Sequence, residues 1–124
     1  MARIFLDTNY FIDAVHRRPE TQILVQLQNH IVYISPISVY NFYYTFKIRT
    51  PNQLFIKQLE KFNYIDFTGD ILHRALQGPT SDIEDNIQLH SSAESDCDYF
   101  LTNDIKLLAM KFFGKTKILS SLTS

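Results

Sequence analysis

Short apolar runs alternate with segments of helical periodicity along the whole chain, and this alternation most limits the possible folds. Strands that are buried on both faces of a sheet read as nearly continuous apolar runs. Such runs predict strands at residues 3–6, 31–34, 64–67, 98–101 and 117–119. Because strands that alternate with helices form parallel sheets, we expect an α/β fold. Its form would be a three-layer α/β/α sandwich with a central parallel sheet of four to five strands.

Helices are expected between these runs, at residues 8–16, 20–30, 37–48, 52–61, 70–76, 82–95 and 104–112. Pro36 suits the first turn of its helix, where no backbone N–H is needed. Ser81 or Asp82 is expected to cap the helix that follows it. Gly114 is expected to end the last helix.

Size and composition restrict the class of protein. A chain of 124 residues, of which 45% are hydrophobic, fits a single domain over residues 1–124. The formal net charge of −1 excludes a nucleic-acid binder that relies on overall positive charge. Cys97 is the only cysteine, so an internal disulfide is excluded and a reducing, cytoplasmic location is expected.

No segment of the sequence favours secretion or a membrane partner. Asp7 and Asp13 interrupt the apolar N-terminal stretch, whereas a signal peptide has an uninterrupted apolar core. No uncharged stretch reaches the roughly 18 residues that a membrane helix needs.

Carboxylates follow two of the predicted strands. Asp7 comes directly after the first strand, and Asp104 comes shortly after the fourth. Ligands of open parallel sheets bind outside the carboxyl ends of the strands, so neighbouring strands would bring both carboxylates to one edge. The predicted helix that precedes the fourth strand adds Asp82, Glu84 and Asp85.

Carboxylates that converge at one edge repel one another, and a divalent cation removes that repulsion. Mg²⁺ and Mn²⁺ favour carboxylate oxygens and water, and such an ion can activate a water for attack on a phosphodiester. Without the ion, the carboxylates cannot all ionise easily, so we predict a raised pKa for the most buried one.

Each acidic residue also has an ordinary structural interpretation. An aspartate at the end of a strand often caps the next helix, which applies to Asp7, Asp104 and especially Asp82. Glu84 is expected to be a solvated surface residue. Spacing alone therefore leaves a metal site and a set of helix caps open.

Other polar and aromatic residues also have two interpretations. The aromatic run at residues 40–46 favours packing over the stacking of bases. For the two basic pairs, Arg17 with Arg18 and Lys47 with Arg49, solvated surface charge is favoured over contact with phosphates.

Two segments carry a resemblance to a known family. IFLDTNYFIDAV near the start and SDIEDNIQLHSSAESDCDYFLTND near the end resemble the PIN-domain family, in particular its small prokaryotic members. The resemblance implies an α/β/α sandwich that hydrolyses RNA phosphodiesters with Mg²⁺ or Mn²⁺. It matches Asp7, Asp85 and Asp104 to the family's acidic, metal-binding positions. The residues matched to supporting positions are Thr8, Asn9 and Thr102, with Asp82 beside them on the acidic helix.

One position departs from the family's pattern. Where the family commonly has a glutamate in the helix after the second strand, this chain has Asn41. An amide oxygen can bind a metal but has no charge, so metal affinity should fall and a second metal is less favoured. One metal and two metals both stay open.

The resemblance also suggests partners. Many small PIN proteins resemble the toxin of a toxin–antitoxin pair, so RNA, an antitoxin protein and a second copy of the chain are candidate partners. The alternative is a catalytically weak or inactive PIN fold that acts as an RNA- or protein-binding module.

Overall fold

A computed structural model describes residues 1–122 and contains a six-stranded sheet in the order β3-β2-β1-β4-β6-β5. The strands are β1 (Arg3–Leu6), β2 (Ile31–Ile34), β3 (Asn63–Tyr64), β4 (Tyr99–Leu101), β5 (Phe112–Phe113) and β6 (Thr116–Leu119). All neighbouring strands pair in parallel except β5, which runs antiparallel to β6. The predicted central parallel sheet is confirmed, with one short antiparallel strand added at its edge.

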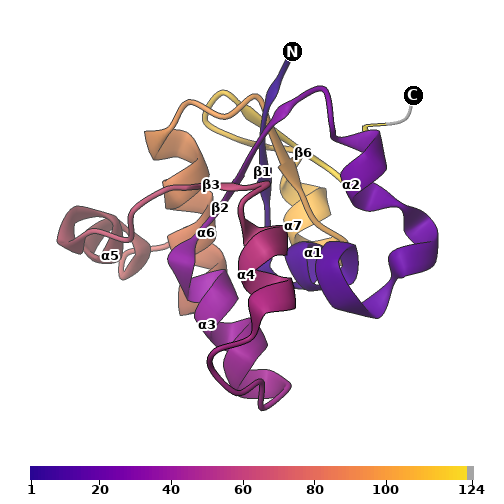
Figure 1. The fold of residues 1–124 in the computed structure, drawn as a ribbon. Coiled ribbons are helices and arrows are strands. Elements are labelled where there is room, and N and C mark those ends of the chain that lie inside the picture. The colour runs from indigo at the N-terminus through magenta and orange to yellow at the C-terminus, as the bar shows by residue number, and fades with distance from the viewer. Residues whose placement is uncertain (123–124) are drawn as a thin grey trace.

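Helices cover both faces of this sheet, as the sequence predicted (Figure 1). Helices α1 to α4 pack on one face and α5 to α7 on the other. The α-helices are α1 (Thr8–Ile12), α2 (Ile23–Gln26), α3 (Pro36–Thr45), α4 (Gln53–Leu59), α5 (Gly69–Ala75), α6 (Ile83–Glu94) and α7 (Ile105–Met110). A π-helix, η1 (Asp13–Arg17), continues α1, and a 3₁₀ turn, η2 (Pro19–Thr21), precedes α2.

Strand β1 supplies side chains to two separate cores. Ile4 and Leu6 pack with residues of α1, α2 and α3. Phe5 packs with residues of α5, α6 and α7, and its ring stacks on Phe100 of β4 with the centroids 5.4 Å apart. Because successive side chains of a strand point to opposite faces, one continuous apolar run serves both layers.

Polar caps set the points at which helices begin after strands and loops. The side chains of Ser35, Asn52, Thr68, Asp82 and Asp104 each accept a hydrogen bond from a backbone N–H of the following helix. These bonds satisfy donors that have no partner inside the helix. The expected capping by Asp82 and the expected place of Pro36 in the first turn are both confirmed.

The predicted last helix is too long. Helix α7 ends at Met110, and Lys111 has a positive φ of 67°. Phe112 and Phe113 then form β5, which pairs with β6 through a tight turn that contains Gly114 at φ 60°. Glycine adopts this conformation without strain, so Gly114 belongs to a hairpin turn and does not end the helix as expected.

The predicted helices over residues 8–16 and 20–30 are also irregular. The first begins as α1 and continues as the π-helix η1, in which the backbone N–H of Arg18 donates to Asp13 O at 3.0 Å. The second is reduced to η2 and the four residues of α2, because Gln22 has a left-handed backbone with φ 51°. Apolar spacing alone did not reveal either interruption.

The aromatic run at residues 40–46 divides between the core and the surface. Phe42 is buried among Phe11, Phe55 and other rings, as the packing interpretation predicted. Tyr40 and Tyr44 instead stack on each other at the surface and are 64% and 74% exposed. The packing interpretation is therefore confirmed for Phe42, and packing of the two tyrosines at a dimer surface stays a prediction.

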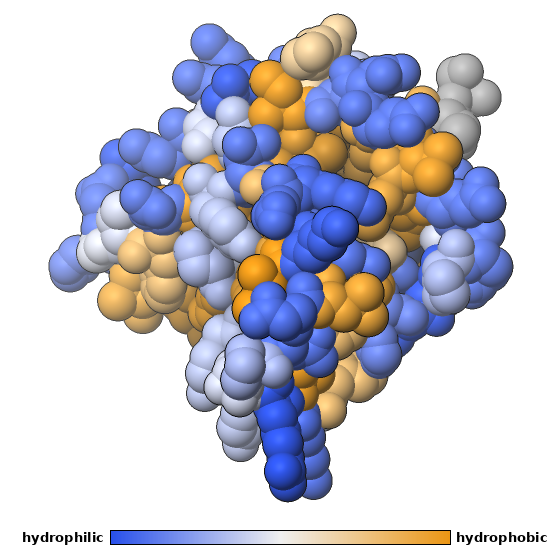
Figure 2. Space-filling model, in the orientation of Figure 1, coloured by the Kyte–Doolittle hydropathy of each residue, from blue (hydrophilic) through white to orange (hydrophobic). Residues whose placement is uncertain are grey.

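The surface of the molecule is mixed in character. On the face drawn in Figure 2, hydrophobic residues reach the surface in several separate groups among hydrophilic ones. Within residues 1–122, no helix has the length and apolar character that crossing a bilayer requires.

The order of the strands defines where a ligand would bind. From β1 the chain adds β2 and β3 on one side, then returns to add β4 and β6 on the other side. The direction of winding therefore changes between β1 and β4. In open α/β sheets the crevice at such a switch point, outside the carboxyl ends of the strands, is the usual binding site.

Candidate functional site

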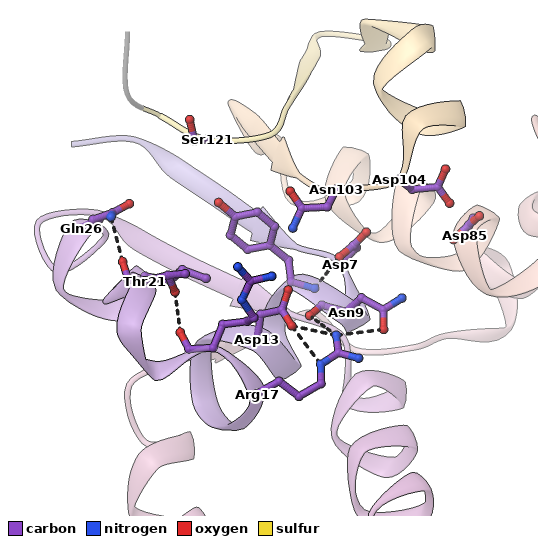
Figure 3. Close-up of a pocket in the computed structure, with 13 residues that line it drawn as sticks. Asp7, Asn9, Asp13, Arg17, Thr21, Gln26, Asp85, Asn103, Asp104 and Ser121 are labelled. Atoms are coloured by element: carbon purple, nitrogen blue, oxygen red, sulfur yellow. Dashed lines mark hydrogen bonds and ion pairs between the residues drawn. The ribbon is translucent and has the colours of Figure 1, made fainter.

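A pocket of about 870 Å³ opens at this switch point, and four of the predicted site residues line it, namely the three acidic ones and Asn9. Asp7 follows β1, Asp104 precedes α7 after β4, and Asp85 lies in the first turn of α6. Figure 3 shows Asp85 and Asp104 on one side of Asp7, and Asp13 with Arg17 on the other. Three elements that are far apart in the sequence therefore place their carboxylates in one pocket.

Asp7 is the most buried of the three carboxylates, with 6% of its surface exposed. Its Oδ1 accepts the backbone N–H of Tyr10 at 2.8 Å, and its Oδ2 accepts the hydroxyl of Thr102 at 2.5 Å. Burial raises the pKa of Asp7 to about 6, although these two hydrogen bonds oppose the rise, and the charges of Asp104 and Asp13 add to it. The predicted rise for the most buried carboxyl is confirmed, but burial causes more of it than repulsion does.

Asp85 is half-buried, and its pKa is also raised to about 6. Burial is the largest cause, followed by the negative charges of Asp82, Asp104, Asp7 and Glu84. The charge of Asp104 thus helps to raise the pKa of both Asp7 and Asp85, and the charge of Asp7 helps to raise that of Asp85. A cation among them would favour the ionised forms of Asp7 and Asp85.

The carboxylates do not form a closed metal cage. Within residues 1–122, no three His, Cys, Asp or Glu side chains lie close enough together to hold a metal ion as a group. Mg²⁺ does not need such a cage, because proteins usually bind it through one or two carboxylates and several waters. The oxygen donors and the raised pKa of two of them fit a hydrated divalent ion and do not fit a structural metal such as zinc.

Thr102 joins two of the acidic residues. It is fully buried, its hydroxyl donates to Asp7, and the same oxygen accepts the backbone N–H of Asp104 at 3.0 Å. One side chain therefore orients the Asp7 carboxylate and the start of the loop to α7. Orientation of this kind is usual around metal-binding carboxylates.

The other predicted supporting residues lie in different surroundings. Asn9 lines the pocket and accepts hydrogen bonds from the guanidinium of Arg17. Asp82 accepts the backbone N–H of Asp85 at 2.9 Å, so it acts as a helix cap beside the site. Asn41 lies half-buried on α3 and is not among the residues that line the pocket.

Thr8 belongs to a buried network that sequence reasoning did not find. The side-chain amide of Gln88 accepts the Thr8 N–H and donates to the Thr8 hydroxyl, each at 2.8 Å. That hydroxyl also bonds to Ser38 of α3 at 2.9 Å. Since Gln88 is one turn after Asp85, the network ties the start of α1, beside Asp7, to the helix that contains Asp85. The only hint in the sequence is an amide between two apolar residues, Ile87 and Leu89.

Four charged or aromatic residues also line the pocket, although they were not predicted as site residues from the sequence. Asp13 and Tyr10 line it without having been predicted as site residues. Arg17 and Arg18 also line it, although surface charge was the favoured interpretation of this pair.

Comparisons with known proteins bear on the family and the fold. The family model described as PIN domain matches residues 4–112. The structure is similar to VapBC2 from Rickettsia felis, solved bound to a DNA fragment from its promoter, with 15% identity, a TM-score of 0.66, and 94% of this chain and 97% of that chain covered. It is similar to VapC20 from Mycobacterium tuberculosis, a sarcin–ricin loop cleaving toxin, with 12% identity, a TM-score of 0.65, and coverage of 92% and 98%.

A third similar structure is FitAcB from Neisseria gonorrhoeae, with 18% identity, a TM-score of 0.59, and coverage of 82% of this chain and 87% of that one. No curated protein is similar enough in sequence to count as a relative. At these identities the likeness to solved structures concerns the fold.

Replacement of Asp7 by asparagine should stabilise the metal-free protein at neutral pH. The folded pKa of about 6 lies above the ordinary 3.8, so the folded state binds more protons between these values and loses stability as pH rises through them. At pH 7.5 the free energy of unfolding of the Asp7→Asn variant should exceed that of the parent by about 1–3 kcal/mol. At pH 4 the two free energies of unfolding should be nearly equal. Urea unfolding in EDTA measures both.

The exposed Asp66 provides a matched control. Asp66→Asn should leave the stability and its pH dependence unchanged. If Asp7→Asn kept the pH dependence of the parent, the burial of an ionisable Asp7 would be contradicted.

Replacement of Gln88 by leucine should loosen the start of α1. The Thr8 N–H would lose its buried partner, which typically costs about 1–3 kcal/mol, and hydrogen exchange at the Thr8 amide should accelerate. Asn86 is the control, because it is also a buried α6 amide but bonds to Ala75 and Thr80. Asn86→Leu should lower stability while leaving Thr8 protected. Equal protection of Thr8 in both variants would contradict the role of Gln88.

Proposed function

The chain belongs to the PIN-domain family, and we propose that it is an endoribonuclease that hydrolyses RNA phosphodiester bonds with Mg²⁺ or Mn²⁺. The observation that supports this most is the meeting of Asp7, Asp85 and Asp104 in one pocket at the switch point of the sheet. These residues match the acidic positions of the family. We propose that residues 1–124 form one domain.

In this proposal one or two of Asp7, Asp85 and Asp104 would bind the ion directly, and the remaining acidic side chain would bind it through water. A bound ion would supply charge neutralisation at the phosphate and activation of a water. Thr102 keeps Asp7 oriented, and Gln88 keeps α1 in place against α6. Asp85 has no hydrogen-bond donor on its carboxylate within the described residues 1–122. The oxygens of this carboxylate are therefore free to bind the ion or to accept a proton from a water.

We further propose that the chain is the toxin of a toxin–antitoxin pair, with an antitoxin protein as a partner. Its support is the fold shared with VapC20, a toxin, and with VapBC2. A homodimer and a cytoplasmic location stay predictions from the sequence.

A second candidate function is an RNA- or protein-binding module with weak or no catalysis. Two observations favour it: Asn41 replaces the glutamate that is common in the family, and within residues 1–122 no three candidate ligands form a closed group. The two functions differ in whether a carboxylate is needed for turnover.

The first test is cleavage of a mixed pool of single-stranded RNA with Mn²⁺. Asp7→Asn and Asp104→Asn should each lower the rate by at least about 100-fold, because the metal would no longer be held and the charge at phosphorus no longer neutralised. Asp66→Asn should cleave like the parent. No cleavage by the parent across Mg²⁺, Mn²⁺ and varied RNAs would favour the binding module. Equal cleavage by all proteins would indicate a contaminating nuclease.

A second test concerns position 41. If Asn41 occupies the family's glutamate position in function, Asn41→Glu adds a charged oxygen donor, one methylene further from the backbone, and should tighten Mn²⁺ binding. Asn41→Ala should bind Mn²⁺ more weakly than the parent. Titration calorimetry on the three proteins measures the affinities, and equal values would show that position 41 lies outside the metal site.

A further inference from the structure

The pocket has a cationic side as well as an acidic one. Arg17 and Arg18 line it together with Asp7, Asp85 and Asp104. We infer that Arg17 and Arg18 form a phosphate subsite, which binds a backbone phosphate of single-stranded RNA next to the phosphate that lies at the carboxylates. That the ligand is RNA rests on the proposed function, whereas the location of the subsite rests on the residues that line the pocket.

Arg17 is held in place with part of its guanidinium unused. Its Nε donates to Asp13 Oδ1 at 2.9 Å, and its Nη2 donates to the carbonyl oxygen of Asn9 at 3.1 Å (Figure 3). Its Nη1 has no hydrogen-bond partner within residues 1–122, and 40% of the side chain is exposed. A guanidinium that is oriented by two neighbours and has free N–H groups is suited to bind an anion.

Arg18 is freer than Arg17. Within residues 1–122 its one ion pair joins Nε to Glu20 at 3.4 Å, and the two side chains are 61% and 65% exposed. Exposed pairs of this kind contribute little to stability. Both of its Nη groups have no hydrogen-bond partner in the part of the chain that the structure describes. A phosphate could therefore engage Arg18 with little loss of existing contacts.

The backbone at this point is unusual in a way that affects both arginines. Asp13–Arg17 form a π-helix, which closes with the bond from Arg18 N–H to Asp13 O. A π turn contains one more residue than an α turn, so it changes the direction of the side chains that follow. Such turns are frequent at functional sites. Here the turn accompanies two consecutive arginines that both reach the pocket wall.

Charge complementarity favours RNA as the ligand. Four aspartates line the pocket, namely Asp7, Asp13, Asp85 and Asp104, so without a cation any polyanion is repelled. A divalent ion would neutralise the acidic side, and the two arginines would then neutralise a second phosphate of the same strand. An acidic peptide could bind the two arginines, but it has no phosphate to place at the ion, as the proposed function requires. RNA affinity should therefore depend on both the divalent ion and the arginines.

The test measures binding of a fluorescent single-stranded RNA by anisotropy, with Ca²⁺ as the divalent ion and with EDTA. Arg17→Gln and Arg18→Gln should each weaken binding in Ca²⁺ by about tenfold, which is the usual effect of one lost charged hydrogen-bond pair. Each should also reduce the slope of log affinity against log salt by about 0.7, the contribution of one contact to a single strand.

Arg74→Gln is the matched control. Arg74 also pairs with an aspartate four residues earlier, Asp70, and is 56% exposed, but it lies on α5 and does not line the pocket. Its replacement should leave RNA binding unchanged. If Arg17→Gln and Arg18→Gln bound RNA as tightly as Arg74→Gln does, the subsite would be ruled out.

A second experiment identifies the phosphate of the RNA that the two arginines contact. In a set of oligonucleotides, one neutral methylphosphonate linkage is moved along the strand. At one linkage the parent should lose affinity by about tenfold or more, whereas the double variant Arg17→Gln, Arg18→Gln should lose nothing further there. Equal losses in both proteins at every linkage would overturn the inference.

Two further outcomes separate this inference from its premises. If the parent binds RNA through the arginines but cleaves no RNA, the phosphate subsite is supported and the proposed nuclease activity is contradicted. If cleavage requires Asp7 but is unchanged in Arg17→Gln and Arg18→Gln, the nuclease activity is supported and the subsite is contradicted. A poly-glutamate peptide that competes with RNA at similar concentration, and loses affinity in the same variants, would assign the arginines to an acidic protein partner and overturn the inference.

Discussion

The hydrogen bond from the Thr102 hydroxyl to the Asp7 carboxylate joins the two central strands where the pocket lies. The backbone strengthens the same junction, because Asp7 N–H donates to Leu101 O at 3.2 Å. Asp7 would otherwise be a buried charge with one backbone donor, and such a charge is costly. With Thr102 in place, the carboxylate is held at the carboxyl ends of both β1 and β4. The same hydroxyl oxygen accepts the backbone N–H of Asp104, so the junction also positions the start of α7.

Burial makes Asp7 an energetic compromise. Its pKa rises to about 6 because the surrounding protein removes water, and the hydrogen bonds recover only part of that loss. A fold selected for stability alone would fill this position with an apolar or neutral residue. Perturbed carboxyls in a cleft are instead characteristic of functional sites, where a cation or a substrate supplies the missing stabilisation. The pKa of Asp85, on α6, is raised in the same way, so two separate elements each place a destabilised carboxylate in the pocket.

The two sides of the pocket are held by different means. On the acidic side, buried neutral groups fix the geometry: Thr102 bonds Asp7, and Gln88 clamps Thr8 against α6. On the other side, a partly buried ion pair with Asp13 and a π-helical turn hold Arg17, whereas Arg18 has an exposed ion pair with Glu20. Buried, satisfied networks are rigid, whereas exposed ion pairs exchange readily with other partners. The pocket therefore combines a carboxylate that is fixed by buried groups, Asp7, with one oriented cation, Arg17, and one cation that can adapt to a ligand, Arg18.

Much of the fold was determined by sequence alone. Apolar runs ending in Asp7 and near Asp104 were enough to predict strands with carboxylates at one edge, since strand period and the direction of parallel strands are local properties. The cap at Asp82 was equally readable, because a cap depends on neighbouring backbone groups. The segments that matched the family's pattern then connected these acids to one kind of site.

Tertiary structure alone decided the rest. The π-helix after α1, the reduction of residues 20–30 to a short helix, and the β5–β6 hairpin are set by packing and by left-handed residues such as Gln22 and Lys111. The partner of Thr8 is 80 residues away, at Gln88. The raised pKa of Asp7 depends mainly on how much water the folded chain excludes. These features arise from contacts between distant segments, and a sequence pattern reports only on neighbours along the chain.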